Sequence, residues 1–356
     1  MNHRRRSLTA LPLLLVVAVV AGCSGEQPAA RPTPTRAAPS SPASPTPPPE
    51  ITVAFAGDVH FAERTLRLLD DPDTAFGPIS EQLSAADVSI VNLETAVTEG
   101  GTKEPKQFHF RAPPSAYQAI KAAGIDAVSL ANNHALDYGQ DGFADTMRHA
   151  EEAGVPVFGA GVDRRAAYAP WVTEVRGVKI AVVGLSQIRE LSERWAATDD
   201  RAGIAMAHDV AAAAEAVRAA RKQADVVLVY LHWGKEGDQC PTSRMTTLAK
   251  ALADAGATAV IGTHAHLLLG DGWLGKTYVS YGLGNFLWWW NDAFSNDTGV
   301  LRLTLRGSAL TDTEFVPALI SRTTGQPLPA EGDEAVRLSK KYAALRDCTG
   351  LADGPS

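Results

Sequence analysis

The chain has 356 residues, of which 45% are hydrophobic and 21% charged, and its formal net charge is −7. A chain of this length can bury one large or two small hydrophobic cores, so a folded interior is expected. An acidic chain without a basic tract argues against a nucleic-acid partner.

The first 22 residues have the pattern of a signal peptide. A positively charged start is followed by an apolar run, Leu11–Val20, that is too short to span a bilayer. Small residues then precede Cys23, as in a bacterial lipobox. We therefore expect a lipidated Cys23 that anchors the mature protein at the extracytoplasmic face of the cell membrane. An ordinary secretory signal with a coincidental cysteine is the alternative.

The next segment, 24–50, consists almost entirely of Pro, Ala, Ser and Thr. Such a composition cannot build a core and favours an extended polyproline II conformation. At about 3.1 Å per residue it would hold a domain up to roughly 80 Å from the membrane. The sequence thus predicts a signal peptide (1–22), a lipidated cysteine with a linker (23–50), a folded domain (51–347) and a tail (348–356).

Apolar runs alternate with helical patterns from residue 51 onward. Strands are predicted at 51–56, 88–93, 127–131, 155–158, 171–175, 178–184, 226–231 and 259–262. Helices are predicted between them at 62–69, 78–83, 114–123, 141–153, 210–222 and 242–255. Only strands follow, at 276–281, 286–290, 299–305 and 309–316, before a closing helix at 333–345. This order predicts an α/β fold, a four-layer α/β/β/α sandwich of two mixed sheets. A single doubly wound sheet is the alternative.

Four short motifs place a histidine or a carboxylate just past a predicted strand, and a fifth is possible. They use five of the nine histidines, and they are Gly57-Asp58-Val59-His60, Ala131-Asn132-Asn133-His134, Leu231-His232-Trp233-Gly234, Gly262-Thr263-His264-Ala265-His266 and, as the fifth, Val91-Asn92-Leu93-Glu94. Divalent cations bind such mixtures of imidazole, carboxylate and amide ligands. The carboxyl ends of strands also point into one crevice of an open α/β sheet. Each motif alone is readily explained as a cap, turn or core residue. Their co-occurrence predicts one shared metal site.

Two of these motifs allow more specific expectations. The spacing of His264 and His266 predicts that both imidazoles lie on the same side of a strand. Asp137, three residues beyond His134, is placed either to orient that imidazole or to cap the following helix.

The loop after the second predicted strand carries four potentially cationic side chains, Lys103, Lys106, His109 and Arg111. It is either a solvated loop or an anion clamp, and in a clamp Arg111 and Lys106 would bind substrate. The triplet Trp288-Trp289-Trp290 would alternate between two faces as core and rim residues, or would stack on a ligand.

Three cysteines are present, and a lipidated Cys23 leaves Cys240 and Cys348. An exported protein lives where disulfides persist, and an even remainder suggests pairing. We expect a disulfide between these two residues. Two unpaired thiols are the alternative.

Together the motifs resemble the bacterial capsule-synthesis protein CapA family. The resemblance covers about residues 51–317, and Ala131-Asn132-Asn133-His134-Ala135-Leu136-Asp137-Tyr138-Gly139 is its most specific stretch. It implies a role in the assembly, export or release of an acidic extracellular polymer, poly-γ-glutamate. Membrane proteins of polymer synthesis are then candidate partners.

That family is in turn similar to calcineurin-like metallophosphoesterases. The similarity implies one or two divalent ions (Mn, Fe or Zn), held by Asp58, His60 and His266 and by Asn133, His232 and His264. His134 would then donate a proton to a leaving group. The aspartate that bridges the two metals in those enzymes is missing here, and the fifth motif offers only Asn92 or Glu94 in its place. The resemblance thus leaves open a polymer-assembly role and a metal-dependent hydrolase of phosphoesters or of the polymer's amide bonds.

Overall fold

The structure is a computed structural model that describes residues 17–19, 21–22, 47–292 and 294–356. The predicted lipidation site Cys23, most of the signal peptide and most of the linker lie outside these residues. Within the part that is described, no helix has both the length and the apolar character needed to cross a membrane.

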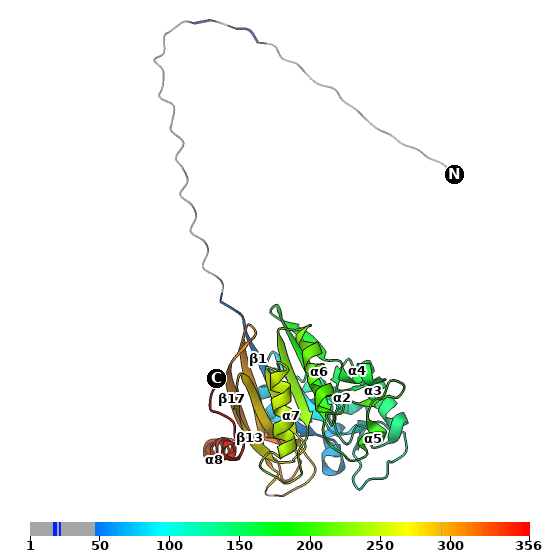
Figure 1. Ribbon diagram of the computed structural model, residues 1–356. Helices are drawn as coiled ribbons and strands as arrows, with labels where there is room; N and C mark the ends of the chain where they lie inside the picture. Colours follow the sequence, from blue (N-terminus) through cyan, green and yellow to red (C-terminus); the bar gives the residue numbers. More distant parts are fainter. Residues whose placement is uncertain (1–16, 20, 23–46, 293) are drawn as a thin grey trace, which may run out of the picture. The chain divides into compact units, whose positions relative to one another are not determined.

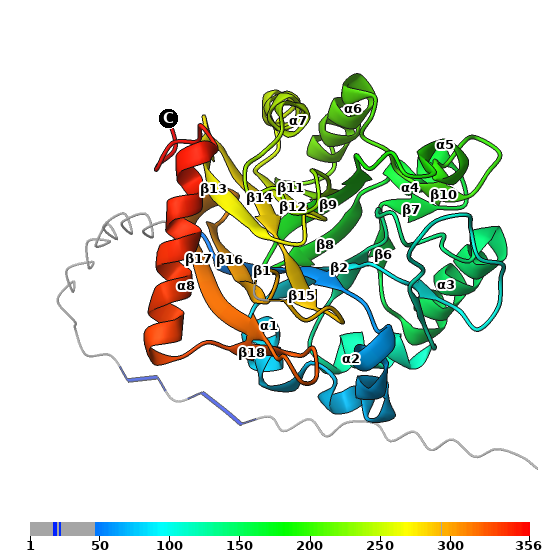
Figure 2. The ribbon, with the colours of Figure 1, turned by 90° about the horizontal axis from the view of Figure 1, so that it is seen from below.

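The first sheet is mixed and has eight strands (Figures 1 and 2). Its order is β18 (Pro327–Pro329), β17 (Ala309–Ile320), β16 (Asp297–Arg306), β1 (Glu50–Val59), β2 (Val88–Leu93), β5 (Ala127–Ser129) and β6 (Val157–Phe158), with β15 (Asn285–Leu287) also paired to β1. Strands β1, β2, β5, β6 and β15 run parallel, whereas β16, β17 and β18 add antiparallel pairs.

The second sheet has six strands, of which the central four are parallel and the two edges antiparallel. Its order is β13 (Leu268–Leu274), β14 (Thr277–Leu283), β12 (Ala259–Thr263), β11 (Val226–His232), β9 (Val178–Ser186) and β8 (Trp171–Val175). Both sheets are thus mixed, as predicted.

The two sheets pack face to face, and helices cover both outer faces (Figure 2). Alternation along β1 sends Val53 and Phe55 into the core between the sheets and Ala54 toward the helices. The first sheet is covered by α1 (Ser80–Ser84), α2 (Ser115–Ala122) and α3 (Gly139–Ala153), and the second by α6 (Val210–Arg221) and α7 (Ser243–Asp254). The four-layer prediction is therefore confirmed, and the single doubly wound sheet is not observed.

Shorter elements complete the domain. They are the 3-10 helices η1 (Glu63–Asp70), η2 (Pro72–Thr74), η3 (Gly77–Ile79) and η4 (Leu345–Cys348), the helices α4 (Arg164–Tyr168), α5 (Ser192–Trp195) and α8 (Gly332–Ala344), and the strand pairs β3 (Ala96–Val97) with β4 (Arg111–Ala112) and β7 (Ala160–Gly161) with β10 (Gly203–Ile204). The helix predicted at 62–69 is η1, and the strand predicted at 286–290 shrinks to β15.

The folded domain extends beyond the predicted boundary at residue 347. Ala352 pairs with Trp273 of β13, with backbone N–O distances of 2.8 and 2.9 Å, and the Ser356 N–H donates to Gly275. The segment 348–356 therefore contacts the edge of the second sheet and is not a free tail.

Close packing of two glycines brings β1 and β15 together at the end of the first sheet. A Cβ on Gly57 would lie 1.9 Å from the carbonyl oxygen of Gly284, so a larger residue would push the strands apart. The Asp58 N–H donates to the same carbonyl at 2.9 Å, and the parallel register sets Asp58 beside Asn285.

Candidate metal centre

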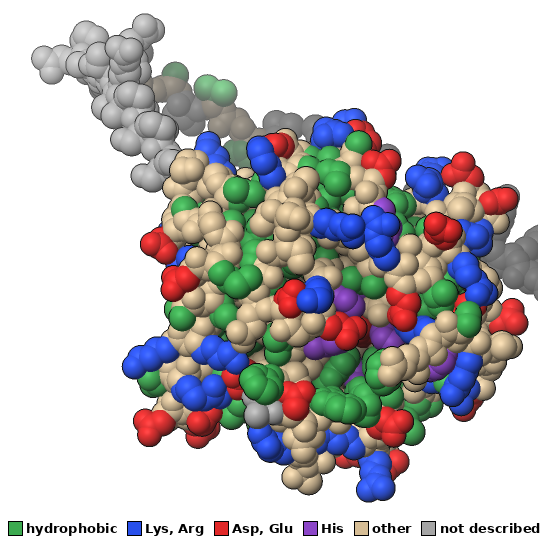
Figure 3. Space-filling view, turned by 60° about the horizontal axis from the view of Figure 1, so that its bottom comes forward, with side chains coloured by type: hydrophobic (Ala, Val, Ile, Leu, Met, Phe, Trp, Pro, Cys, Tyr) green, Lys and Arg blue, Asp and Glu red, His purple; other side chains and the backbone are tan. Residues whose placement is uncertain are grey.

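The histidines gather in a hollow in the middle of one face of the molecule (Figure 3). Asp58 is fully buried, in register with Asn92 of β2 and Asn285 of β15. The Asn92 amide donates to Asp58 Oδ1 at 2.8 Å, and the His264 N–H donates to Asp58 Oδ2 at 3.0 Å. These two bonds fix the orientation of the carboxylate.

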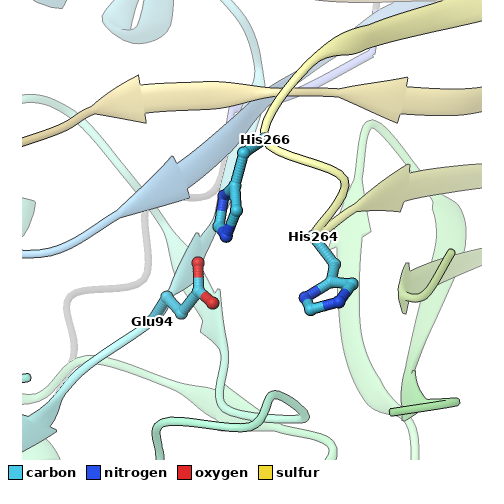
Figure 4. Close-up of side chains that lie close together, drawn as sticks. All are labelled: Glu94, His264 and His266. Carbon is cyan, nitrogen blue, oxygen red and sulfur yellow. The ribbon is translucent and has the colours of Figure 1, made fainter. Parts of the chain in front are cut away.

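Glu94 belongs to two groups of ligand atoms that could hold metal ions, one with Asp58 and His232 and one with His264 and His266. Within each group the atoms lie within 4.8 Å of one another. Figure 4 shows the Glu94 carboxylate just below the His266 ring, with the His264 ring on the other side of the space that these side chains face. Two ions sharing a carboxylate would fit this arrangement.

Both oxygens of Glu94 are buried without a hydrogen bond. Burial, followed by the charge of Asp58, raises the pKa of Glu94 well above its usual range. A buried carboxylate in this state is costly unless a proton or a cation compensates it. The residues present therefore fit one or two divalent ions, and Glu94 is the carboxylate that both candidate groups share.

His232 ends β11 with its ring surrounded by polar groups. Its Nε2 lies 3.2 Å from Glu94 Oε1, 2.7 Å from Asn133 Oδ1 and 3.0 Å from His264 Nδ1. Burial lowers the pKa of His232 to about 3, although nearby Asp58 opposes this shift. A neutral imidazole is the form that binds a metal.

His264 and His266 do not sit on a strand, so the expected strand alternation was wrong. β12 ends at Thr263, and the two histidines have φ angles of +88° and +58° in the turn that follows. Residues other than glycine rarely adopt such angles, and strain of this kind is found at functional sites. The turn brings His264 Nδ1 to His232 and places His266 Nδ1 2.8 Å from Asn285 Oδ1 and 3.5 Å from Asp58 Oδ2.

Asp137 orients His134 and does not cap α3. Its Oδ2 lies 2.6 Å from His134 Nδ1 and accepts the Phe110 N–H at 2.6 Å. The other ring nitrogen of His134 lies 3.9 Å from Glu94 Oε1, so this imidazole faces the candidate metal centre. Burial raises the pKa of Asp137 to about 6, although Lys106 opposes the shift.

Lys106 is a buried support of this dyad and not an exposed anion clamp. Only 2% of its side chain is accessible. Its ammonium lies 2.9 Å from Asp137 Oδ1 and 3.0 Å from Glu190 Oε2, and it donates to the carbonyl of Asn133. These three partners use all three of its donors, so the prediction that Lys106 binds substrate is not supported.

Arg111 also differs from its predicted role. Pairing of β4 with β3 buries Ala112 and leaves Arg111 exposed, with its guanidinium 4.5 Å from the Tyr138 ring. The side chain does not line the cavity beside the metal centre.

His60 is not brought into either group of metal ligands. Its ring packs 4.3 Å from the rings of Phe110 and Trp288, and its Nδ1 accepts the Ala62 N–H at 3.1 Å. Its other ring nitrogen, Nε2, lies 3.4 Å from the Trp289 N–H, so both nitrogens face backbone donors. His60 thus supports the aromatic wall of the site.

A cavity of about 980 Å³ opens beside the metal centre and reaches His134 and His266. Six aromatic side chains line it: Phe108, Phe110, Trp288, Trp289, Trp290 and Phe294. β15 ends at Leu287, so the tryptophan triplet lies in a loop and all three members reach the cavity, contrary to the expected alternation. Trp288 is 4% exposed and Trp290 is 50% exposed, which makes a wall and a rim.

Cys240 is joined to Cys348 by a disulfide with a Cα–Cα distance of 5.7 Å. Cys240 also lines the cavity, so the bond ties the cavity wall to the C-terminal segment that follows α8.

Several polar residues of the site were missed in the sequence. Asn132 donates to Asn92 Oδ1 at 3.0 Å and accepts the His134 N–H at 3.0 Å, and Asn285 contacts His266. The signal for Asn285 was available, since it follows a strand and a glycine as Asp58 does. Glu190 lies far along the chain from Lys106 and gave no such signal.

Sequence comparisons agree on one family. A family model described as bacterial capsule synthesis protein PGA_cap matches residues 52–288. The capsule biosynthesis protein CapA of Bacillus anthracis is 28% identical over 293 residues, 80% of this chain and 71% of that protein. The PGA biosynthesis protein CapA of Bacillus subtilis is 27% identical over 308 residues, 84% of this chain and 78% of that protein. A probable polyglutamine synthesis accessory protein of Mycobacterium tuberculosis is 31% identical over 224 residues, 59% of each chain.

Solved structures give weaker similarity. A phosphatase from Mycoplasma pneumoniae matches 84% of this chain and 99% of its own with 14% identity and a TM-score of 0.48. A putative 5′-nucleotidase from Staphylococcus aureus matches 84% of this chain and 58% of its own with 16% identity and a TM-score of 0.49. The family assignment therefore rests on the sequence matches, which span most of the folded domain and all the motifs of the site: the chain belongs to the bacterial capsule synthesis protein PGA_cap family.

Proposed function

We propose that this protein is a lipid-anchored member of its family that acts on poly-γ-glutamate outside the cell membrane, during polymer assembly, export or release. The observation that carries the proposal is the family match over residues 52–288, which includes every ligand of the candidate metal centre. The lipobox-like start and the proline-rich linker suit a tethered extracytoplasmic domain. Membrane proteins of polymer synthesis are its proposed partners.

A divalent ion, Mn, Fe or Zn, is the proposed cofactor. Asp58, Glu94, His232, His264 and His266 would hold it, with Asn133 beside His232. When bound, such an ion would compensate the buried carboxylates and polarise an oxygen of the ligand. The aromatic wall would exclude water from one side of the ligand.

A gene deletion tests this function. We expect the deletion strain to lose surface polymer or to change its chain length, and we expect the wild-type gene to restore both. A gene with His232→Ala is expected to fail, whereas one with His149→Ala, a half-buried histidine of α3 that contacts Glu152, should succeed. Unchanged polymer in the deletion strain would rule the proposal out.

A metal-dependent hydrolase is the second candidate, and Glu94 favours it. The missing bridging aspartate was the main argument against a two-metal site, and Glu94 is shared by both groups of ligands. His134, held by Asp137 and facing Glu94, is placed to protonate a leaving group.

A substrate panel separates the two candidates. Purified protein supplied with Mn²⁺, Fe²⁺ or Zn²⁺ would be assayed on aryl phosphates and on γ-linked glutamate oligomers. For a hydrolase we expect His134→Ala to lower the rate about 10²- to 10⁴-fold, the usual contribution of general acid catalysis. No turnover of any substrate would leave the assembly role as the function of the site.

A further inference from the structure

A second, smaller cavity of about 240 Å³ lies apart from the aromatic one and is lined by cationic side chains. Arg189 and Arg244 both line it. His208 also lines it and is half-buried. The aromatic cavity has no lysine or arginine in its lining. Of these two cavities, only the smaller one is therefore lined by arginine.

The carboxylates next to this cluster are already engaged. Glu190 follows Arg189 in the chain but pairs with Lys106 at 3.0 Å. Asp209 follows His208 but accepts the N–H groups of Ala211 and Ala212 at the start of α6. Among the residues that the structure describes, neither of these two neighbouring carboxylates, Glu190 and Asp209, forms an ion pair with Arg189 or Arg244.

His208 lines the same cavity as the two arginines. Its Nε2 contacts the Ile188 carbonyl at 3.2 Å. Burial lowers the pKa of this imidazole, the carbonyl opposes the shift, and the positive charges of Arg189 and Arg244 add to it. Both charges therefore lie close enough to His208 to act on it.

The cluster is adjacent to the candidate metal centre. The Gln187 N–H, in the same cavity, donates to the carbonyl of His232 at 2.9 Å. Three residues later Glu190 contacts Lys106 and the Asn133 amide. One short segment, 187–190, therefore lines the cationic cavity on one side and supports the metal centre on the other.

We propose that the cavity of Arg189, His208 and Arg244 binds a free carboxylate of an acidic polymer while the neighbouring part of the same polymer chain lies at the metal centre. Arginine pairs with carboxylates through two parallel hydrogen bonds, which suits a repeated carboxylate better than a point charge does. The volume admits one or two such groups and not a whole polymer. Ser243, the first residue of α7, adds a hydroxyl and the positive end of a twelve-residue helix.

The identity of the ligand as poly-γ-glutamate rests on the proposed function, but the anion site does not. A fluorescent decamer of γ-linked glutamate, titrated into the full-length protein in mild detergent, provides the test. We expect the double variant Arg189→Gln/Arg244→Gln to bind it at least tenfold more weakly, with a shallower dependence on salt. Arg165→Gln removes an exposed arginine on α4 and should bind like the wild type.

Three outcomes decide the proposal. Equal affinity of the wild type and the double variant would overturn it. Binding of inorganic phosphate by a protein that does not bind the decamer would also overturn it, since the ligand would then be a free anion. Decamer binding lost in the double variant but kept by Glu94→Gln would support it and would separate this site from the metal centre. Unchanged polymer in the deletion strain would overturn the proposed function while leaving this measurement intact.

Discussion

The structure distinguishes Glu94 from Asn92 as the residue that two metal ions could share. The fifth motif offered Asn92 and Glu94 as bridging residues, and their spacing could not choose between them. In the structure the Asn92 amide is committed to Asp58, and its Oδ1 accepts from Asn132. Glu94 is left buried without a hydrogen bond and is shared by both ligand groups.

The change Glu94→Gln should separate metal binding from folding. It removes a shared negative ligand, so we expect the metal content of the purified protein to fall and the thermal stabilisation by added metal to disappear. That stabilisation should reach about 2.7 kcal/mol in the wild type when the metal is at 100 times its Kd. Without metal the variant should melt at or above the wild-type temperature, because an uncompensated buried carboxylate is gone. Full metal content in the variant would contradict the bridging role.

Lys106 contributes to the site as a buried cation that pairs with Asp137 and Glu190. Lys106→Met leaves Asp137 and Glu190 without their cation, and breaking a buried pair in this way typically costs about 3–5 kcal/mol. We expect urea denaturation to show a loss of this size. Lys103→Met, which removes an exposed lysine of the same loop, should change the free energy of unfolding little. Similar losses in the two variants would show that Lys106 is not the support described.

Strands and helices with strong periodic patterns were predicted closely. β2 has the predicted limits, and α3 ends at Gly154, whose φ of +66° is the left-handed conformation that terminates a helix. β13 was missed because Leu268–Leu274 contains two glycines and an aspartate, which are turn signals in sequence. The turn at His264 and His266 was missed because strained backbone is imposed by the surrounding fold and leaves no pattern in the sequence.

Helix α8 is held to the first sheet by a partly buried ion cluster. Asp297, at the start of β16, accepts two bonds from Arg337 at 2.7 and 3.0 Å and one from Lys341 at 2.6 Å. Burial alone would raise the pKa of Asp297, but these hydrogen bonds outweigh it and lower the pKa. A lowered pKa stabilises the fold fully above the unfolded value of about 3.9, and this contribution is lost as the pH falls below it.

Asp297→Asn tests this docking. At pH 7 we expect the free energy of unfolding to fall by about 1–3 kcal/mol, the usual range for charge-assisted hydrogen bonds. At pH 3 the difference between variant and wild type should shrink, because the wild-type carboxylate is being protonated. Asp312→Asn, on the exposed part of β17, is the matched control and should show little effect at either pH. An equal loss for Asp297→Asn at both pH values would show that the charge is not responsible.

The fold as a whole was accessible from sequence because its layers follow from the order of the elements. The site was accessible only in part. Strand-end motifs identified Asp58, His232 and the turn histidines, since parallel strands bring their carboxyl ends to one edge. Contacts between distant segments, such as Lys106 with Glu190 or His60 with Trp288, depend on how the loops pack over that edge of the sheet. No short sequence pattern predicts them.

A disulfide joins Cys240 to Cys348, which are 108 residues apart. In the chain-entropy model a closed loop of this size stabilises the fold by about 4–5 kcal/mol. The bond also holds the loop that lines the aromatic cavity, since Cys240 and Pro241 both face it. Removing the bond should therefore loosen the cavity wall as well as lower the stability.

The paired variant Cys240→Ser/Cys348→Ser, compared with the wild type in protein lacking Cys23, tests both effects. We expect its urea midpoint to fall, and we expect reductant to destabilise the wild type but not the variant. Thiol titration of the denatured, unreduced wild-type domain should find no free thiols. Two free thiols would mean that the cysteines are unpaired in the cell. A variant as stable as the wild type would mean that the folded packing around α8 already fixes the C-terminal segment, so that the bond adds little.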